Sequence, residues 1–334
     1  RIGDPSGKDK TRTILSEEEI EKNINNIKKI LKNFLDNKDP KTKPLFVNNY
    51  SWLKNLNYIS FLRDIGKHFT INKMLSFDSV KTRLEREQSL SYMEFNYMIL
   101  QAYDFLELNK KENCVLQVGG SDQWGNIVNG VDLIKRHSNK QAYGLTTPLI
   151  TLASGAKMGK TESGAVWLDK KFLSSYDYWQ FWRNIDDRDV LKFLKIFTDL
   201  SIDEIENIKN KDINQLKIIL ANKATSMLHG ENEAKASEET AKKTFLENSL
   251  GSELPSILIN ENQLDKKINI IDLIILSKLE TSKSEIRRLI KGNGVKINNQ
   301  PITDEKLIII KNLFKDNTIK LSLGKKRHIK VELS

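Results

Sequence analysis

A long hydrophobic run without Gly or Pro occupies residues 91–109. Ser91 and Glu94 at its start have the spacing of a capping box, in which two side chains satisfy free backbone N–H groups at a helix N-terminus. The pattern therefore predicts a helix. Its hydrophobic positions cover nearly the whole circumference, which indicates burial on most sides; they are Tyr92, Met93, Phe95, Met98, Ile99, Leu100, Ala102, Phe105 and Leu106.

Three polar residues form a stripe within this hydrophobic surface. Tyr97, Gln101 and Asp104 stand at positions i, i+4 and i+7, which share one face of a helix. A phenol, an amide and a carboxylate on a buried face need hydrogen-bond partners. The stripe alone slightly favours an internal network or a solvent-facing position. The neighbouring motifs favour a small polar ligand.

A strand, a Gly-Gly turn and a second helix are predicted next. Residues 114–118 read as a short hydrophobic strand that ends at Gly119 and Gly120. Ser121 or Asp122 is then expected to cap a helix whose hydrophobic positions include Ile127, Val131 and Ile134. This arrangement presents backbone amides where an anionic group or a ribose can approach.

Two lysines bracket a glycine in residues 157–161, a loop expected after a strand at residues 148–152. Gly155 and Gly164 on either side let the loop move and let its backbone approach a ligand. The spacing misses the Walker phosphate loop by one residue, and an extended apolar run replaces the helix that a Walker loop opens. The loop is therefore suited to binding phosphate oxygens in a site that is not a Walker loop. The alternative is a solvated basic loop.

The rest of the chain divides into three regions. Residues 174–248 read as helical, with a second capping box at Ser201 and Glu204. Residues 249–268 read as a linker. Residues 269–334 predict two short helices, the second one capped by Ser282 and Glu285, followed by a small sheet.

Charge is concentrated at the C-terminal end of the chain. The 334 residues carry a net charge of +10, and residues 266–334 hold 16 Lys and Arg against 7 Asp and Glu. This asymmetry predicts a small polyanion-binding domain, with a solvated basic tail as the alternative.

Other features of the composition narrow the functional classes. Cys114, the single cysteine, is expected in a strand and allows no disulfide within the chain, which favours a reducing compartment. The four histidines are scattered, so we expect no metal site. No apolar run reaches membrane-spanning length, so we expect no membrane partner.

Three motifs together resemble the bacterial-type tyrosyl-tRNA synthetases of class I. Residues 157–161 resemble their Lys-Met-Ser-Lys-Ser signature, with Gly159 and Thr161 in place of the two serines. Residues 3–7, Gly-Asp-Pro-Ser-Gly, and residues 119–126, Gly-Gly-Ser-Asp-Gln-Trp-Gly-Asn, match two further segments of that family. The basic C-terminal region resembles an RNA-binding module that this family shares with a ribosomal protein and with pseudouridine synthases.

The resemblance covers essentially the whole chain and implies an α/β fold. Its expected parts are a partial Rossmann-like class I catalytic domain at 1–172, a helical domain at 173–248, a linker at 249–268 and a small α+β RNA-binding domain at 269–334. The implied activity is that of a tyrosine–tRNA ligase, which activates L-tyrosine with ATP and magnesium and transfers it to the 3′ end of tRNA(Tyr). A homodimer in the cytoplasm is also implied, with an organellar address left open.

The resemblance also implies a role for individual residues. The tyrosine pocket would comprise Asp4, Tyr97, Gln101, Asp104, Gln117 and Gln123. Within it, Asp104 would accept a hydrogen bond from the phenol hydroxyl. The ATP site would comprise Gly120, Asp122, Lys157 and Lys160. The catalytic clamp on the leaving pyrophosphate would comprise Lys157, Lys160, Thr161, Lys8 and Arg12. The RNA contacts would be Arg287, Arg288 and Lys326.

One departure from the family leaves an alternative function open. The chain begins within the loop that contains the Gly-Asp-Pro-Ser-Gly segment, so we expect it to lack the first part of the nucleotide-binding fold, including the His-Ile-Gly-His motif, and to be inactive as given. A non-catalytic RNA-binding protein is therefore the alternative. The related tryptophanyl enzymes fit less well, because Asp104 would face an indole.

Overall fold

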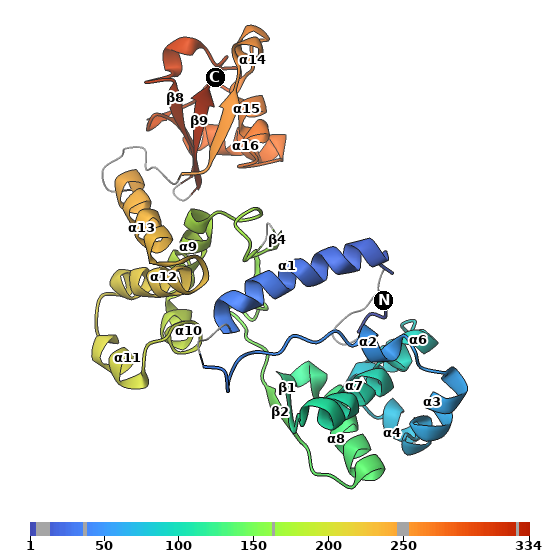
Figure 1. Cartoon of the computed structure of the whole chain (residues 1–334). Coiled ribbons are helices and arrows are strands. Elements are labelled where there is room, and N and C mark those ends of the chain that lie inside the picture. Colours follow the sequence, from blue (N-terminus) through green and yellow to red (C-terminus); the bar gives the residue numbers. More distant parts are fainter. Residues whose placement is uncertain (5–13, 36–38, 162–163, 246–253, 325–326) are drawn as a thin grey trace. The chain divides into compact units, whose positions relative to one another are not determined.

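The computed structural model describes residues 1–4, 14–35, 39–161, 164–245, 254–324 and 327–334. The chain divides into two compact units, Arg1–Met158 and Gly159–Ser334 (Figure 1). This division falls inside the lysine-containing loop of residues 157–161. The domain boundaries expected from the sequence at residues 172 and 248 stay predictions.

The first unit is mainly helical. Its α-helices are α1 (Glu17–Leu35), α2 (Tyr50–Leu53), α3 (Tyr58–Asp64), α4 (Ile71–Leu75), α5 (Asp78–Glu85), α6 (Tyr92–Phe95), α7 (Tyr97–Glu112) and α8 (Trp124–Ser138). Two strands, β1 (Leu116–Gly120) and β2 (Tyr143–Thr147), pair in parallel along their whole length. A parallel pair needs a crossover connection, and α8 provides it.

Helices α7 and α8 pack against each other in the core of this unit. Phe105 from α7 and Leu133 and Ile134 from α8 are almost fully buried. Gly130 permits the close approach of the two helices, because a Cβ atom there would lie 2.9 Å from Cδ1 of Phe105. This packing confirms the burial expected from the hydrophobic circumference of residues 91–109.

The predicted helix of residues 91–109 is divided in two at Asn96. The capping box is confirmed: Ser91 Oγ accepts from the Glu94 backbone N–H, and Glu94 Oε2 accepts from the Ser91 backbone N–H at 3.0 Å. The Asn96 side chain donates to the Tyr92 carbonyl at 2.8 Å, so it competes for the backbone acceptors of the first turn. Tyr92 was expected to be buried but is 66% exposed, because it lies on the short α6 outside the α7–α8 contact.

Three expectations around β1 and β2 were wrong. Strand β1 begins after Cys114 and continues through Gly119 and Gly120, because both glycines pair with β2. A 3-10 turn (Ser121–Gln123) precedes α8, so neither Ser121 nor Asp122 caps that helix. Residues 148–152 are not a strand, since β2 ends before Pro148, which has no N–H to donate. Cys114 nevertheless packs against the core of the unit.

The second unit begins with a short antiparallel pair, β3 (Lys160–Thr161) and β4 (Gly164–Ala165). The predicted helical region follows as α9 (Ser175–Arg183), α10 (Val190–Phe197), α11 (Ile202–Ile208), α12 (Ile213–His229) and α13 (Glu231–Phe245). The capping box of Ser201 and Glu204 is confirmed at the start of α11. Trp182 packs against Phe193 and Phe197, which joins α9 to α10.

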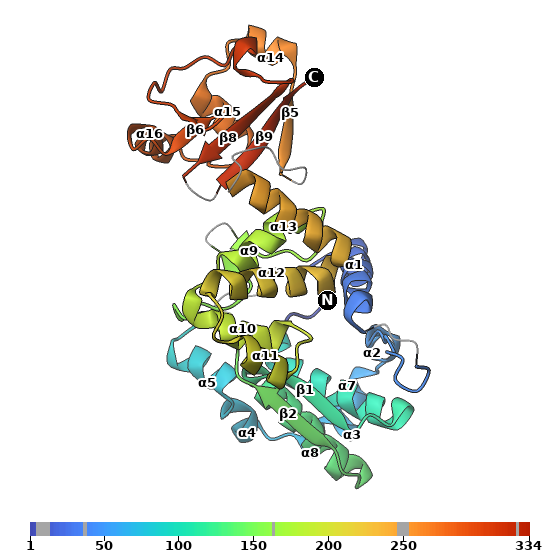
Figure 2. The same ribbon diagram turned by 90° about the vertical axis from the view of Figure 1, so that its left-hand side faces the viewer.

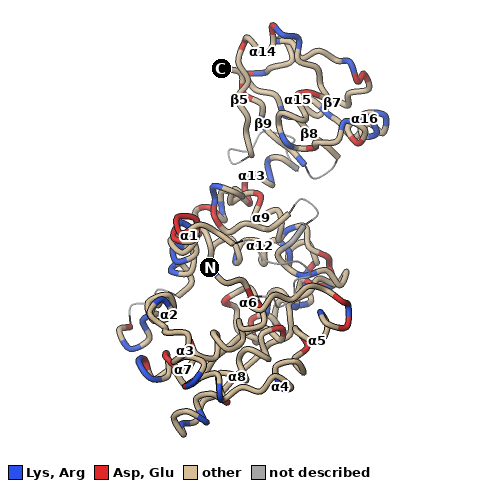
Figure 3. Tube along the Cα trace, turned by 90° about the vertical axis from the view of Figure 1, so that its right-hand side faces the viewer, with Lys and Arg blue, Asp and Glu red and all other residues tan. Residues whose placement is uncertain are grey.

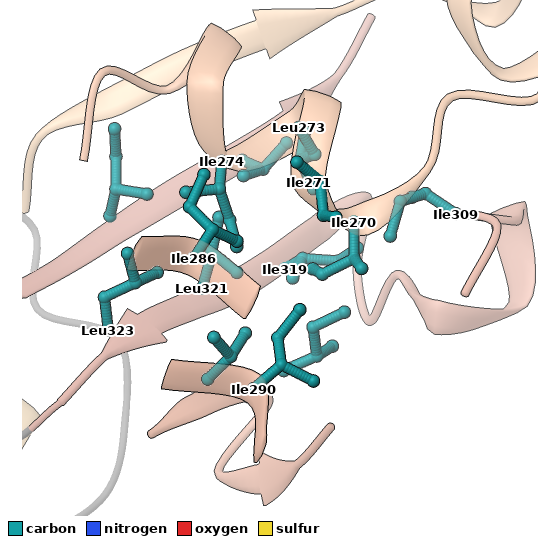
Figure 4. Packing of buried hydrophobic residues seen from close by; sticks show 14 of the residues in the cluster. Ile270, Ile271, Leu273, Ile274, Ile286, Ile290, Ile309, Ile319, Leu321 and Leu323 are labelled. Carbon is teal, nitrogen blue, oxygen red and sulfur yellow. The ribbon is translucent and has the colours of Figure 1, made fainter. Parts of the chain in front are cut away.

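A five-stranded sheet lies at the C-terminal end of the second unit. Its strands run in the order β5 (Ser256–Ile259), β9 (Arg327–Leu333), β8 (Thr318–Leu323), β6 (Val295–Ile297) and β7 (Gln300–Pro301). Figure 2 labels the first four of these strands. Helices α15 (Ile270–Leu276) and α16 (Lys283–Lys291) pack on it. Isoleucines of both helices point toward Ile319, Leu321 and Leu323 of β8 (Figure 4).

The linker expected at residues 249–268 was partly wrong. Strand β5 and the short helix α14 (Glu261–Asp265) lie within that range. Strand β5 pairs in parallel with β9, and Ile259 is fully buried. The expected linker therefore contributes a strand to the sheet, because its hydrophobic residues find a partner strand far along the chain.

We expect Gly130→Ala to destabilise the first unit by about 1–3 kcal/mol, because the added methyl group overpacks the α7–α8 contact. Thermal unfolding with circular dichroism would measure the change. Gly66→Ala is the matched control, since a Cβ atom there meets its nearest neighbour at 3.4 Å, an ordinary contact. Equal stability of the two variants would contradict the expectation.

Candidate active site and RNA-binding surface

The polar stripe of α7 lines a cavity in the first unit. The cavity has a volume of about 680 Å³ and is bordered by Tyr97, Gln101 and Asp104. Gln117 of β1 borders it as well, as do Asn49 and Trp52 from the segment around α2. The stripe therefore faces a hollow large enough for an amino acid, with polar groups converging from three parts of the chain.

Asp104 accepts two hydrogen bonds at this cavity. Asn49 Nδ2 donates to Oδ2 at 2.9 Å, and Trp52 Nε1 donates to Oδ1 at 2.8 Å. Burial raises the pKa of the Asp104 carboxyl, and the two donors oppose that rise. Both donors were missed by the sequence reasoning, because they lie more than fifty residues before Asp104 and no local spacing connects them.

Gln117 presents an unsatisfied acceptor in the same cavity. Its Oε1 atom is buried and has no hydrogen-bond partner among the residues that the structure describes. A buried amide oxygen without a partner is costly, and a ligand that donates a hydrogen bond would remove that cost. This orphaned atom fits the expected role of Gln117 in completing the pocket for the tyrosine substrate.

Asp4 and Gln123, two further residues of the expected tyrosine site, contact each other. Gln123 Nε2 donates to Asp4 Oδ2 at 2.8 Å, and Asn126 Nδ2 donates to Gln123 Oε1 at 3.2 Å. Neither Asp4 nor Gln123 borders the cavity of the α7 stripe. The expected tyrosine site therefore forms two groups of residues in the first unit.

The expected ribose-binding residues lie at the end of β1. Gly120 pairs with Thr147 as the last residue of the strand, and Asp122 is exposed in the 3-10 turn that follows. They lie between the end of β1 and the start of α8, and their expected contact with the ribose stays a prediction. Neither residue borders the cavity of the α7 stripe.

The lysine-containing loop is held by backbone contacts on both sides. Lys157 forms an isolated antiparallel β-bridge with Thr151, and the Met158 backbone N–H donates to the Ile150 carbonyl at 2.9 Å. Lys160 and Thr161 form β3. Gly159 between them has a φ of 85°, a left-handed conformation that favours glycine. Lys8 and Arg12, the cations expected opposite this loop, lie outside the described residues.

The expected RNA-binding arginines lie on the exposed side of α16. Arg288 pairs with Glu285 at 2.7 Å, and Arg287 lies 3.5 Å from Glu305. Figure 3 shows basic and acidic residues interleaved on this helix. Exposed ion pairs of this kind are weak, so phosphate groups can compete for both arginines. Lys326, the third expected contact, lies outside the described residues.

Within the described ranges, no group of three or more His, Cys, Asp or Glu side chains is placed to hold a metal ion. None of the described helices is both long enough and apolar enough to cross a membrane.

Two family models match the chain. Residues 1–246 match the model described as tRNA synthetases class I (W and Y), and residues 271–309 match the S4 domain. The chain therefore belongs to the class I tRNA synthetases of the tryptophan and tyrosine type. This match and the S4 match confirm the expected α/β fold with a C-terminal RNA-binding domain.

Similar proteins narrow the assignment within this class. The tyrosine–tRNA ligase of Pelagibacter ubique is 83% identical over 333 residues, which cover 100% of this chain and 81% of that protein. The tyrosine–tRNA ligase of Agrobacterium fabrum is 52% identical over 334 residues, covering 99% and 80% of the two chains. The chain thus belongs with the tyrosyl-tRNA synthetases, as its motifs indicated.

A solved structure agrees with this assignment. The crystal structure of a C-terminally truncated mitochondrial tyrosyl-tRNA synthetase from Aspergillus nidulans aligns with a TM-score of 0.63 and 32% sequence identity. The alignment covers 73% of this chain and 74% of that chain.

Trp52→Phe removes one of the two donors to Asp104 while keeping an aromatic ring. We expect the pKa of Asp104 to rise further above its ordinary value, because a hydrogen bond that stabilises the carboxylate is lost. If tyrosine binds only to the ionised carboxylate, lowering the pH weakens binding. In Trp52→Phe this weakening should begin at a higher pH than in the wild-type protein. Calorimetric titrations with tyrosine across pH 4–8 would measure it.

Trp167→Phe is the control for that titration, because Trp167 is an exposed tryptophan in the second unit. If tyrosine binding to Trp52→Phe weakened at the same pH as binding to the wild-type protein, the result would contradict the expected effect.

Proposed function

We propose that this chain carries the activity of a tyrosine–tRNA ligase. It would activate L-tyrosine with ATP and transfer the tyrosyl group to the 3′ end of tRNA(Tyr). The observation that carries this proposal is the Asp104 carboxylate, held by two N–H donors beside a cavity that also contains the orphaned oxygen of Gln117. The identity to curated tyrosine–tRNA ligases favours this function over a non-catalytic RNA-binding protein.

Recognition of tyrosine would depend on the phenol hydroxyl. That hydroxyl would donate to Asp104, while Tyr97 and Gln101 on the same stripe would accept from the α-amino group. Phenylalanine would leave the Asp104 carboxylate without a partner for its remaining lone pairs, which is unfavourable in a partly buried site. Tyrosyl-tRNA synthetases are themselves the standard example of this kind of discrimination.

Activation is a transfer of the adenylyl group. A carboxylate oxygen of tyrosine attacks the α-phosphorus of ATP, and the bond from that phosphorus to the pyrophosphate oxygen breaks. The carboxylate is already ionised at neutral pH, so the step requires no general base. The 3′-terminal hydroxyl of tRNA then attacks the tyrosyl carbonyl, and AMP leaves.

The residues of the expected clamp would act on the charge that develops on pyrophosphate. Lys157, Lys160 and Thr161, with Lys8 and Arg12, would contact the phosphate oxygens, and the magnesium ion would arrive bound to ATP. Gly120 and Asp122 would hold the ribose. Gln123 would face the substrate carboxylate, and Asp4, which accepts a hydrogen bond from Gln123 Nε2, would hold that amide in place. Positioning and electrostatic stabilisation would therefore supply the catalysis.

The C-terminal domain would bind tRNA. It combines the S4 match with the concentration of positive charge in residues 266–334. The exposed arginines of α16, Arg287 and Arg288, and also Lys326, are the contacts we propose. Phosphate contacts of this kind release counterions, so binding should weaken steeply as salt rises.

We also propose that the protein is a cytoplasmic homodimer. Its candidate interface is an apolar surface on α3 and α6, formed by Tyr58, Ile59, Leu62 and Tyr92, all of which are exposed. The hydroxyls of Tyr58 and Tyr92 lie 3.1 Å apart, so the two helices present one continuous surface. Sedimentation velocity tests the proposal, since a monomer at micromolar concentration would contradict it.

Asp104→Asn tests the assigned specificity. We expect the preference for tyrosine over phenylalanine to fall by about tenfold or more, since the charged acceptor for the hydroxyl is lost. ATP–pyrophosphate exchange with each amino acid would measure it, using protein from the complete open reading frame. The KM for ATP serves as the internal control and should change little. An unchanged tyrosine-to-phenylalanine ratio would refute the role of Asp104.

Lys160→Ala tests the lysine-containing loop. We expect the rate of adenylate formation to fall on the order of a hundredfold with little change in tyrosine affinity, because the contact strengthens as charge develops on pyrophosphate. Single-turnover kinetics would separate rate from affinity. Lys140→Ala, an exposed lysine before β2, is the control. A wild-type rate in the Lys160 variant would make the loop a solvated connection.

Removal of residues 254–334 tests the tRNA-binding domain. The cut precedes β5, because that strand belongs to the C-terminal sheet. We expect adenylate formation to be nearly intact and tRNA charging to fall strongly, since every residue assigned to the pocket lies before this segment. Aminoacylation and pyrophosphate exchange would be compared in the same preparation. Unaltered charging would show that the basic domain is dispensable.

A further inference from the structure

Trp52, which donates to Asp104, belongs to a short helix that buries none of its own residues. Helix α2 has only four residues, and none of them is buried. Its N-cap residue, Asn49, makes no side-chain capping bond, and its Nδ2 atom donates to Asp104. The orientation of the Trp52 indole therefore depends on contacts with other elements.

One such contact is made by Lys111 of α7. Lys111 stands seven residues after Asp104, so it follows Tyr97, Gln101 and Asp104 along the same face of the helix. Its Nζ atom lies 5.3 Å from the centroid of the Trp52 ring. That distance is within the range of a cation–π interaction, for which tryptophan is the best aromatic partner.

Glu107 fixes the position of the Lys111 ammonium group. Its Oε2 atom lies 3.0 Å from Lys111 Nζ, and its side chain is only 11% exposed. A mostly buried carboxylate one turn earlier thus holds a flexible side chain near the indole. The neighbouring Lys110 also approaches Glu107, at 3.9 Å, but the described part of the chain shows no aromatic contact for it.

We propose that Lys111 is a positioning residue for tyrosine recognition, which acts by holding the Trp52 indole so that Nε1 donates to Asp104. The chain of contacts runs from Glu107 through Lys111 and Trp52 to the carboxylate that would bind the phenol hydroxyl. The proposal rests on the specificity role proposed above for Asp104. Lys111 itself does not border the cavity, so its effect is indirect.

The test uses three variants in ATP–pyrophosphate exchange with protein from the complete open reading frame. Lys111→Met keeps the length of the side chain and removes the charge, and it should lower kcat/KM for tyrosine about two- to fivefold, mainly through KM. Exchange with phenylalanine should not change, so the tyrosine preference falls by the same factor. Lys111→Arg should retain the wild-type preference, because guanidinium groups also pack on indoles.

Lys110→Met is the matched control, since it removes the adjacent charge, also near Glu107, and should leave the preference unchanged. A loss in Lys110→Met equal to that in Lys111→Met would assign the effect to general charge and overturn the proposal. An equal loss for tyrosine and phenylalanine in Lys111→Met would overturn it as well.

A double-mutant cycle with Trp52→Leu locates the effect. Without the indole, Lys111→Met should cause no further loss, because the two residues act through one contact. A full additional loss would show that Lys111 acts elsewhere. Asp104→Asn separates the two levels of the proposal: if it alters the tyrosine preference while Lys111→Met does not, only the role of Lys111 fails.

Discussion

The partly buried carboxylate of Asp104 sets the main constraint on the first unit. An ionised carboxylate away from water is costly unless hydrogen bonds stabilise it. The protein meets this demand with Trp52 of α2, a one-turn helix with no buried residue of its own, and with Asn49, which directly precedes that helix. Two hydrogen bonds therefore join the segment around α2 to α7, and both parts of the chain border the cavity.

Much of this arrangement could be predicted from local sequence. The capping boxes at Ser91 and Ser201 appear at the helix starts that they predicted. Tyr97, Gln101 and Asp104 lie on one face of α7, as their spacing indicated, and that face borders a cavity. These features were predictable because helix caps and helix faces depend on residues within one or two turns of each other.

The features that sequence reasoning missed depend on distant partners. The donors of Asp104 lie in another element, and no spacing links them to α7. Strand β1 includes Gly119 and Gly120, usual strand breakers, because the parallel neighbour β2 supplies their hydrogen bonds. The strand expected at residues 148–152 and the linker expected at residues 249–268 were wrong for related reasons, since pairing rather than composition decides where a strand begins and ends.

The pairing of β5 with β9 has a consequence for biosynthesis. Ile259 in β5 is buried in the core that the sheet forms with α15 and α16, and the partner strand of β5 is β9. The ribosome nevertheless makes β5 before both helices and all other strands of the sheet. During translation the hydrophobic side chains of β5 have no partner strand, and an unpaired edge of this kind invites misfolding. Completion of this domain must therefore wait for β9, and nascent chains have to keep β5 protected until then.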